Sequence, residues 1–152
     1  MLYEHCAVNE RGHLAFGGCD VIALARKYGT PLYLMDEDMI RGQSRLYAEA
    51  VKRYFRPGSR ALYASKAGCI KAIYPILRQE GLCADVVSPG EIAIAMRAGF
   101  PAGDLYFHGN VKTPADVRFA IRSGVGCFIA DNPEELKKIE SAAAEAGIRQ
   151  KV

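Results

Sequence analysis

The sequence predicts an α/β fold in which parallel strands alternate with helices. Short apolar runs begin at residues 61, 84, 105 and 127, about 22 residues apart, and a helix-like amphipathic stretch follows each run. Three of these stretches open with proline and all four end in glycine, the polarity expected of helices. Parallel neighbours need crossover connections, so such units build either a doubly wound sheet or a (β/α)8 barrel.

The regular period favours the barrel, and no G-x-G-x-x-G motif follows the first strand, as a dinucleotide-binding sheet would require. We expect five strands, at 31–36, 61–66, 84–88, 105–109 and 127–131. The first is followed by a helix at 37–55. A complete barrel has eight units in roughly 250 residues. The 152 residues therefore predict a partial (β/α)8 TIM-type barrel of about five βα units, and a truncated chain.

The first residues do not follow this period. Residues 1–20 alternate around a turn at 10–12, which is typical of a hairpin. A short helix is expected within 19–29, with Asp20 as its N-cap. We therefore expect residues 1–20 to form an arm outside the barrel and residues 21–152 to form the incomplete barrel.

Composition narrows the function classes. The net charge is only +3 and the basic residues are scattered among acids, which argues against a nucleic-acid or membrane surface as partner. A membrane-spanning helix needs about 20 consecutive apolar residues, and no apolar stretch approaches that length. The five cysteines form no C-x-x-C pair and indicate a reducing, cytoplasmic compartment. Neither they nor the three histidines have metal-ligand spacing, so no metal site is expected.

Polar residues gather where the predicted strands end, at the edge where a barrel carries its chemistry. They are Asp36, Lys66, Asp85 with Ser88, His108 with Asn110, and Asp131. We expect the strand at 61–66 to be buried on both faces. Lys66 should then point into the barrel mouth, away from bulk water and near Asp85. A desolvated lysine favours its neutral amine, which attacks carbonyls, but a structural ion pair at the rim remains equally open.

The other polar residues have plain structural interpretations beside functional ones. His108 alone is more often a satisfied rim histidine, and Gly109 beside it lets the backbone approach a ligand closely. Glu91 in the first turn of a helix is favoured by the helix dipole. Residues 131–134 read mostly as a helix start, with Asp131 or Asn132 as the cap.

At these residues the sequence resembles the fold-type III decarboxylases that use pyridoxal phosphate, and most closely the diaminopimelate decarboxylase branch. Five segments carry the resemblance in order and spacing: "YGTPLYLMDEDMI" (28–40), "ALYASKA" (61–67), "CADVVSPGEI" (83–92), "FHGNVKT" (107–113) and "FIADNPEEL" (128–136). It extends from about residue 12 to the end of the chain.

The resemblance implies that Lys66 holds pyridoxal 5'-phosphate covalently, with Ala64 lining the pocket beside it. It also implies that Asp85 corresponds to an aspartate near the cofactor and Glu91 to a glutamate near the same cofactor. His108 and Asn110 would belong to the motif that separates this branch from the ornithine branch. Residues 1–20 would pair into a separate β-domain built mostly from the second half of the family's chain.

The implied activity is that of a lyase of lysine biosynthesis, the decarboxylation of meso-diaminopimelate to L-lysine and CO2. The partners would be a small amino acid substrate and, in the full-length family, a second copy in a homodimer. The family's second half supplies further cofactor contacts, so we expect little or no activity from the isolated chain. Three alternatives stay open: an ornithine, arginine or carboxynorspermidine decarboxylase of the same fold, a non-catalytic or inert barrel fragment, and an unrelated Schiff-base aldolase barrel.

Overall fold

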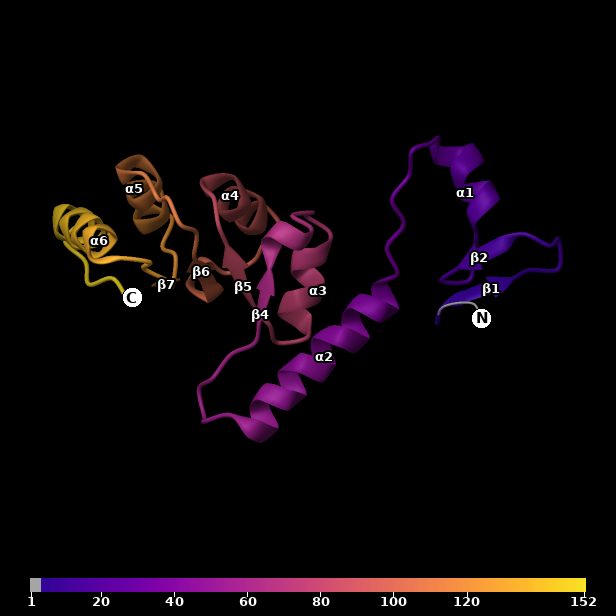
Figure 1. Cartoon of the computed structure of the whole chain (residues 1–152), viewed down its shortest axis with the longest axis horizontal. Coiled ribbons are helices and arrows are strands. Elements are labelled where there is room, and N and C mark those ends of the chain that lie inside the picture. Colours follow the sequence, from indigo (N-terminus) through magenta and orange to yellow (C-terminus); the bar gives the residue numbers. More distant parts are fainter. Residues whose placement is uncertain (1–3) are drawn as a thin grey trace. The chain divides into compact units, whose positions relative to one another are not determined.

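The chain is seen in a computed structural model that describes residues 4–152. It forms two compact units, one ending at Gly42 and the other comprising Gln43–Val152 (Figure 1). Residues 1–3 of the predicted arm lie outside the described residues.

The first unit contains a small antiparallel sheet in the order β1-β2-β3 (Figure 1). Its strands are β1 (Cys6–Val8), β2 (Leu14–Phe16) and β3 (Cys19–Asp20). The turn between β1 and β2 is closed by the Gly12 amide, which donates to the Asn9 carbonyl at 2.9 Å. Gly12 has φ +72°, a conformation that glycine adopts without strain. The predicted hairpin with its turn at 10–12 is therefore confirmed, whereas β3 is too short for alternation to reveal.

The helix α1 (Val21–Tyr28) follows β3 directly. The Asp20 side chain accepts hydrogen bonds from the amides of Ile22 at 2.9 Å and Ala23 at 3.1 Å. These amides lack partners within the first turn, so the carboxylate satisfies donors that the helix leaves free. The predicted N-cap is confirmed.

The predicted strand at 31–36 is wrong. The segment pairs with no strand of residues 4–152, and Tyr33 is 95% exposed. An apolar run makes a strand only where a neighbour accepts its backbone hydrogen bonds. Asp36 instead caps α2 (Glu37–Tyr54), the helix that the sequence predicts at 37–55.

The second unit contains a parallel sheet in the order β4-β5-β6-β7, which is also the order along the chain (Figure 1). The strands are β4 (Leu62–Ala64), β5 (Cys83–Val86), β6 (Leu105–Phe107) and β7 (Cys127–Phe128). The four predicted strands from residue 61 onward and their parallel pairing are confirmed. The strands are shorter than predicted, and β4 gives way to a 3-10 turn, η1 (Ser65–Ala67).

A helix follows each strand and joins it to the next strand or to the chain end (Figure 1). The helices are α3 (Ile73–Gln79), α4 (Pro89–Arg97), α5 (Pro114–Arg122) and α6 (Pro133–Glu145), with a short 3-10 turn η2 (Ala102–Asp104) before β6. The last three open with proline behind a side-chain cap from Ser88, Thr113 and Asn132, respectively. Beyond each of the four helices stands a glycine with positive φ: Gly81, Gly99, Gly124 and Gly147.

The two faces of the parallel sheet differ in burial. Val86, Phe107 and Phe128 lie in one row of the register and are at most 1% exposed, and the rings of Phe107 and Phe128 pack edge to face at 5.5 Å. On the opposite face Leu62 is 40% exposed, and Ala64 is half-buried. The expectation that the strand at 61–66 is buried on both faces is therefore wrong for one face. A sheet is buried on both sides only where a second layer or a closed barrel covers it, and these four strands form an open sheet.

The Asp20 cap predicts how the first unit responds to acid. The hydrogen bond with His13 Nδ1 (2.9 Å) and those from the helix amides hold the pKa of the Asp20 carboxyl well below its ordinary value of 3.8. A depressed pKa means that the carboxylate stabilises the folded state above that ordinary value and stops doing so as the pH falls through the folded one. We expect the amide signals of α1 in NMR spectra to lose dispersion progressively below about pH 4.

Asp20→Asn is the matched variant, because asparagine still caps a helix but has no carboxyl to protonate. The amide signals of α1 in this variant should be less dispersed at pH 7 than those of the unmodified chain, and their dispersion should change less between pH 5 and pH 2. An acid response as large as that of the unmodified chain would contradict the assignment to Asp20.

Candidate functional site

The carboxyl ends of the parallel strands bring most of the predicted site residues to one edge of the sheet. The register places Ala64, Asp85 and Tyr106 side by side in one row across β4, β5 and β6. His108 follows directly after β6, and its amide donates to the Val86 carbonyl at 2.8 Å. Parallel strands share the direction of their ends, so the loops after β4 to β7 all leave the sheet at this edge.

Lys66 lies in η1, the turn that leaves β4 two residues after Ala64. Its side chain is exposed, and no hydrogen bond or ion pair joins it to Asp85 or to any other described residue. The expectation that Lys66 is shielded from water is therefore wrong in this chain, because the open face of the sheet leaves the amine in contact with solvent. An unpaired, accessible amine at a strand end remains free to react with a carbonyl.

Two tyrosines fix the turn that carries Lys66. The Tyr63 hydroxyl donates to the Gly68 carbonyl at 3.1 Å, and the Tyr74 hydroxyl donates to Ser65 Oγ at 3.0 Å. Tyr74 and Ser65 are completely buried. Burial raises the pKa of Tyr74, since the phenolate would lose its hydration, so the hydroxyl keeps its proton and remains a donor. The residues on both sides of Lys66 are thus held by hydrogen bonds, whereas Lys66 itself is exposed.

His108 lies between two carboxylates. Its Nδ1 is 3.6 Å from Asp85 Oδ1, and its Nε2 is 3.9 Å from Asp131 Oδ1. Both distances suit an ion pair with a protonated ring and exceed a direct hydrogen bond. The His108 side chain is 45% exposed, which weakens both pairs by solvent screening. Asp131, which the sequence places at a strand end and interprets mostly as a helix start, lies beside His108 at this edge.

Glu91 and Asn110 hold more peripheral places. One Glu91 oxygen accepts the Val87 amide at 2.7 Å, and Ser88 caps the same turn of α4. This geometry agrees with the interpretation of Glu91 as a first-turn acid of the helix. Asn110 is exposed in the loop after β6.

Gly109 has φ +110°, and a Cβ added there would lie 3.3 Å from the Val87 carbonyl oxygen. The close approach that the sequence suggests at Gly109 is thus made to the loop after β5. The loops after β5 and β6 are in contact at the predicted site.

Sequence reasoning missed a buried ion pair beside this edge. The Lys112 ammonium pairs with Glu135 Oε1, and the two side chains are only 1% and 3% exposed. Val111 next to Lys112 is 87% exposed, so the local sequence gives an apolar residue in water beside a charged one in the core. The periodicity of apolar residues cannot reveal that here the valine is exposed and the lysine is buried. The one available signal is the position of Glu135 three residues after the Asn132 cap, where a carboxylate turns back toward the preceding strand end.

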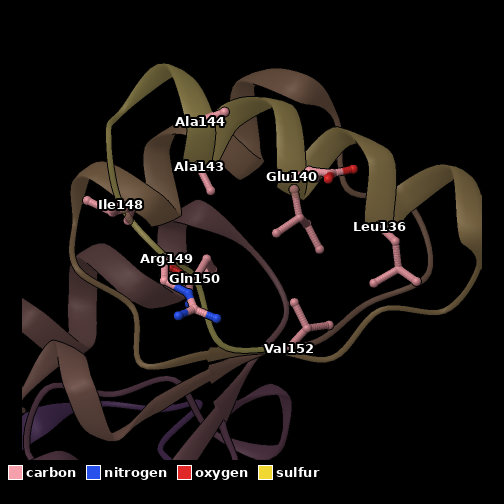
Figure 2. A pocket seen from close by; sticks show the side chains of 9 residues that line it. Leu136, Glu140, Ala143, Ala144, Ile148, Arg149, Gln150 and Val152 are labelled. Atoms are coloured by element: carbon pink, nitrogen blue, oxygen red, sulfur yellow. The ribbon is translucent and has the colours of Figure 1, made fainter.

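A cavity elsewhere in the second unit does not belong to this site. It has a volume of about 480 Å³ and lies between α6 and the C-terminal segment (Figure 2). Figure 2 shows Leu136 and Val152 at one end of it and Ile148 at the other. The segment is held by the Phe128 amide, which donates to the Lys151 carbonyl at 3.0 Å. None of the predicted site residues lines this cavity.

Residues 4–152 contain neither a cluster of metal-ligating side chains nor a membrane-spanning helix. No three side chains among histidine, cysteine, aspartate and glutamate gather closely enough there to hold a metal ion. No helix in that part of the chain combines the length and the apolar character needed to cross a membrane.

The tyrosine contacts of the Lys66 turn predict a stability difference. Tyr74→Phe removes the buried donor to Ser65 Oγ, and we expect the free energy of unfolding in urea to fall by about 1 kcal/mol. Tyr106→Phe is the matched control, because the Tyr106 side chain is half-buried in the same unit and no hydrogen bond of its hydroxyl is present. We expect the control to change stability by less than about 0.5 kcal/mol. Equal effects of the two substitutions would show that the Tyr74 hydroxyl does not hold the turn.

Comparison with known families gives a match over most of the chain. The family described as "Pyridoxal-dependent decarboxylase, pyridoxal binding domain" matches residues 38–152. Diaminopimelate decarboxylase of Bacillus methanolicus is 41% identical over 95% of this chain and 33% of its own length. The Mycobacterium tuberculosis protein of the same name is 37% identical over 95% of this chain and 31% of its own. The chain thus spans about a third of the length of the curated relatives it matches.

Solved structures of decarboxylases are also similar to this chain. A crystal structure of diaminopimelate decarboxylase from M. jannaschii superposes with a TM-score of 0.84 at 35% identity, covering 96% of this chain and 34% of that one. Lysine/ornithine decarboxylase from Vibrio vulnificus, complexed with putrescine, gives a TM-score of 0.71 at 30% identity over 82% of this chain and 33% of that one. The predicted α/β fold, as part of a barrel with a separate N-terminal antiparallel sheet, is therefore confirmed.

Proposed function

The chain belongs to the pyridoxal-dependent decarboxylases, and on that premise we propose that it forms the Lys66-bearing part of an enzyme that converts meso-diaminopimelate to L-lysine and CO2. One observation carries the proposal: the accessible Lys66 amine stands at the end of β4, at the sheet edge where Asp85 and His108 gather.

The residues present fit pyridoxal 5'-phosphate. Its aldehyde condenses with a primary amine, and the Lys66 amine is accessible and forms no ion pair with any described residue. Ala64, at the end of the strand that precedes Lys66, has only a methyl side chain and leaves room for the cofactor. We propose that Lys66 holds the cofactor and that five residues line its surroundings: Ala64, Asp85, Glu91, His108 and Asn110.

The chain's own contribution to the reaction is position and charge. When bound, pyridoxal phosphate supplies the electron sink that amino acid decarboxylation requires. Tyr63 and Tyr74 hold the Lys66 turn, so the amine enters the site from a fixed point of the backbone. Asp85 and Asp131 flank the His108 ring on two sides, at 3.6 Å and 3.9 Å. The ring offers an N–H donor to a carboxylate and the flanking aspartates attract ammonium groups, which suits a substrate carrying both.

The substrate assignment rests on relatives. Curated proteins at 37–41% identity over 95% of this chain are named diaminopimelate decarboxylases, and one solved relative at 35% identity is in complex with L-lysine. The lysine/ornithine decarboxylase that it also resembles is less similar, at 30% identity. We therefore place meso-diaminopimelate ahead of ornithine, arginine and carboxynorspermidine.

Assembly and location are part of the same proposal. We propose a homodimer for the enzyme, with residues 1–20 in a separate β-domain and residues 21–152 in the barrel. All five cysteines are free thiols, which supports a reducing cytoplasmic location.

A chimeric enzyme tests the activity. In this chimera residues 1–152 of the present chain replace the corresponding third of the Bacillus methanolicus enzyme, and CO2 release is measured with meso-diaminopimelate, L-ornithine and L-arginine. We expect activity with meso-diaminopimelate only. Lys66→Ala should lower kcat at least 10³-fold, because no other amine stands at that turn, whereas Lys71→Ala, an exposed lysine a few residues away, should keep kcat within twofold. A folded chimera that releases CO2 faster from another substrate, or that tolerates Lys66→Ala, would overturn the proposal.

A further inference from the structure

The buried pair of Lys112 and Glu135 has no part in the chemistry proposed above. These two are the only charged residues among residues 4–152 whose backbone and side chain are together buried. Taking an ammonium and a carboxylate out of water is costly, and a pair of well-packed apolar side chains often stabilises a fold equally well. The pair therefore calls for an explanation beyond stability.

The Lys112 ammonium contacts three groups. It donates hydrogen bonds to the Gly109 carbonyl at 2.8 Å and to the Ile129 carbonyl at 2.9 Å, and it forms an ion pair with Glu135 Oε1. Gly109 belongs to the loop after β6 and Ile129 to the loop after β7. One cation thus ties the two loops to each other and to α6.

Glu135 extends this link to the second loop. Its Oε2 accepts the Asp131 amide at 3.2 Å, and its own amide donates to Asn132 Oδ1 at 2.9 Å. The carboxylate therefore holds the residue whose side chain approaches His108 Nε2. No apolar pair of the same volume makes the four side-chain contacts, those with Gly109, Ile129 and Asp131 and the one between the two residues, since each needs a polar donor or acceptor.

We propose that Lys112 and Glu135 are positioning residues that set the separation between His108 and Asp131. His108 is the neighbour of Gly109 in one anchored loop, and Asp131 is held directly in the other. If the pair is lost, the two loops can move apart and the His108 ring loses its place between Asp85 and Asp131. The importance of this placement for catalysis rests on the proposed function, but the placement itself does not.

The test separates positioning from stability. In Lys112→Met/Glu135→Met both charges are removed together, so no unpaired charge remains in the core and the chain stays folded. We expect this double variant of the 152-residue chain to unfold at a temperature near that of the unmodified chain. Its His108 ring signals in NMR spectra should shift and broaden, and the Asp131 amide should exchange with solvent at least tenfold faster.

The control removes a comparable ion pair from the same helix. Lys137 and Glu134 pair at 2.8 Å on the exposed face of α6, and their side chains are 70% and 73% exposed. Lys137→Met/Glu134→Met should leave the His108 signals and the Asp131 exchange rate unchanged. Unchanged His108 signals and Asp131 exchange in a folded Lys112→Met/Glu135→Met chain would overturn the inference. Should that variant not fold, Lys112→Met/Glu135→Gln replaces it, because this change removes both charges and the link between the two loops but keeps an acceptor for the Asp131 amide. The His108 ring signals are then the readout: they should shift and broaden, and unchanged signals would overturn the inference.

The chimera tests the consequence for catalysis. The double substitution at 112 and 135 should lower kcat/KM for meso-diaminopimelate at least tenfold, and the double substitution at 134 and 137 should leave it within twofold. An inactive unmodified chimera contradicts the proposed function and leaves the NMR result standing on its own. An active chimera whose kcat and KM are insensitive to the loss of Lys112 and Glu135 contradicts the positioning role alone.

Discussion

Backbone hydrogen bonds between β4, β5, β6 and β7 fix the register on which the candidate site depends. They set Ala64 beside Asp85 and Tyr106, and they carry the turns after β4 and β6 to the same edge. The residues themselves are about 20 positions apart in sequence and have no local reason to meet. A slip of one residue in β5 would send Asp85 to the opposite face, where Val86 and Phe107 form the core.

Side chains near the edge then refine what the register supplies. The buried hydroxyl of Tyr74 holds the turn of Lys66, and the buried ammonium of Lys112 holds the loops of His108 and Asp131. In both cases a polar group is committed to backbone or hydroxyl partners inside the core, while the groups available for chemistry remain accessible. The supporting groups are therefore buried and the reactive groups are exposed. A site that binds a cofactor and a substrate needs rigid support as well as accessible reactive groups.

Local patterns in the sequence were sufficient to predict the repeating part of the fold. The spacing of apolar runs gives β4 to β7 in order, and proline, glycine and cap residues mark the helix ends, as at Asn132. Two predictions failed because they depend on partners rather than on local pattern. Among residues 4–152 no strand pairs with the segment at 31–36, and no second layer covers Lys66. Burial of Lys112 was beyond reach for the same reason, since its partners lie in two other loops and in α6.

We propose that one amine, that of Lys66, is presented at the sheet edge for covalent bonding to an aldehyde. The most direct measurement loads the chimera with one equivalent of pyridoxal 5'-phosphate, reduces it with borohydride and locates the modified lysine by peptide mass spectrometry. The account predicts modification at Lys66, with none at Lys71 or at the buried Lys112. Modification spread over the surface lysines, or concentrated on any lysine other than Lys66, would contradict it.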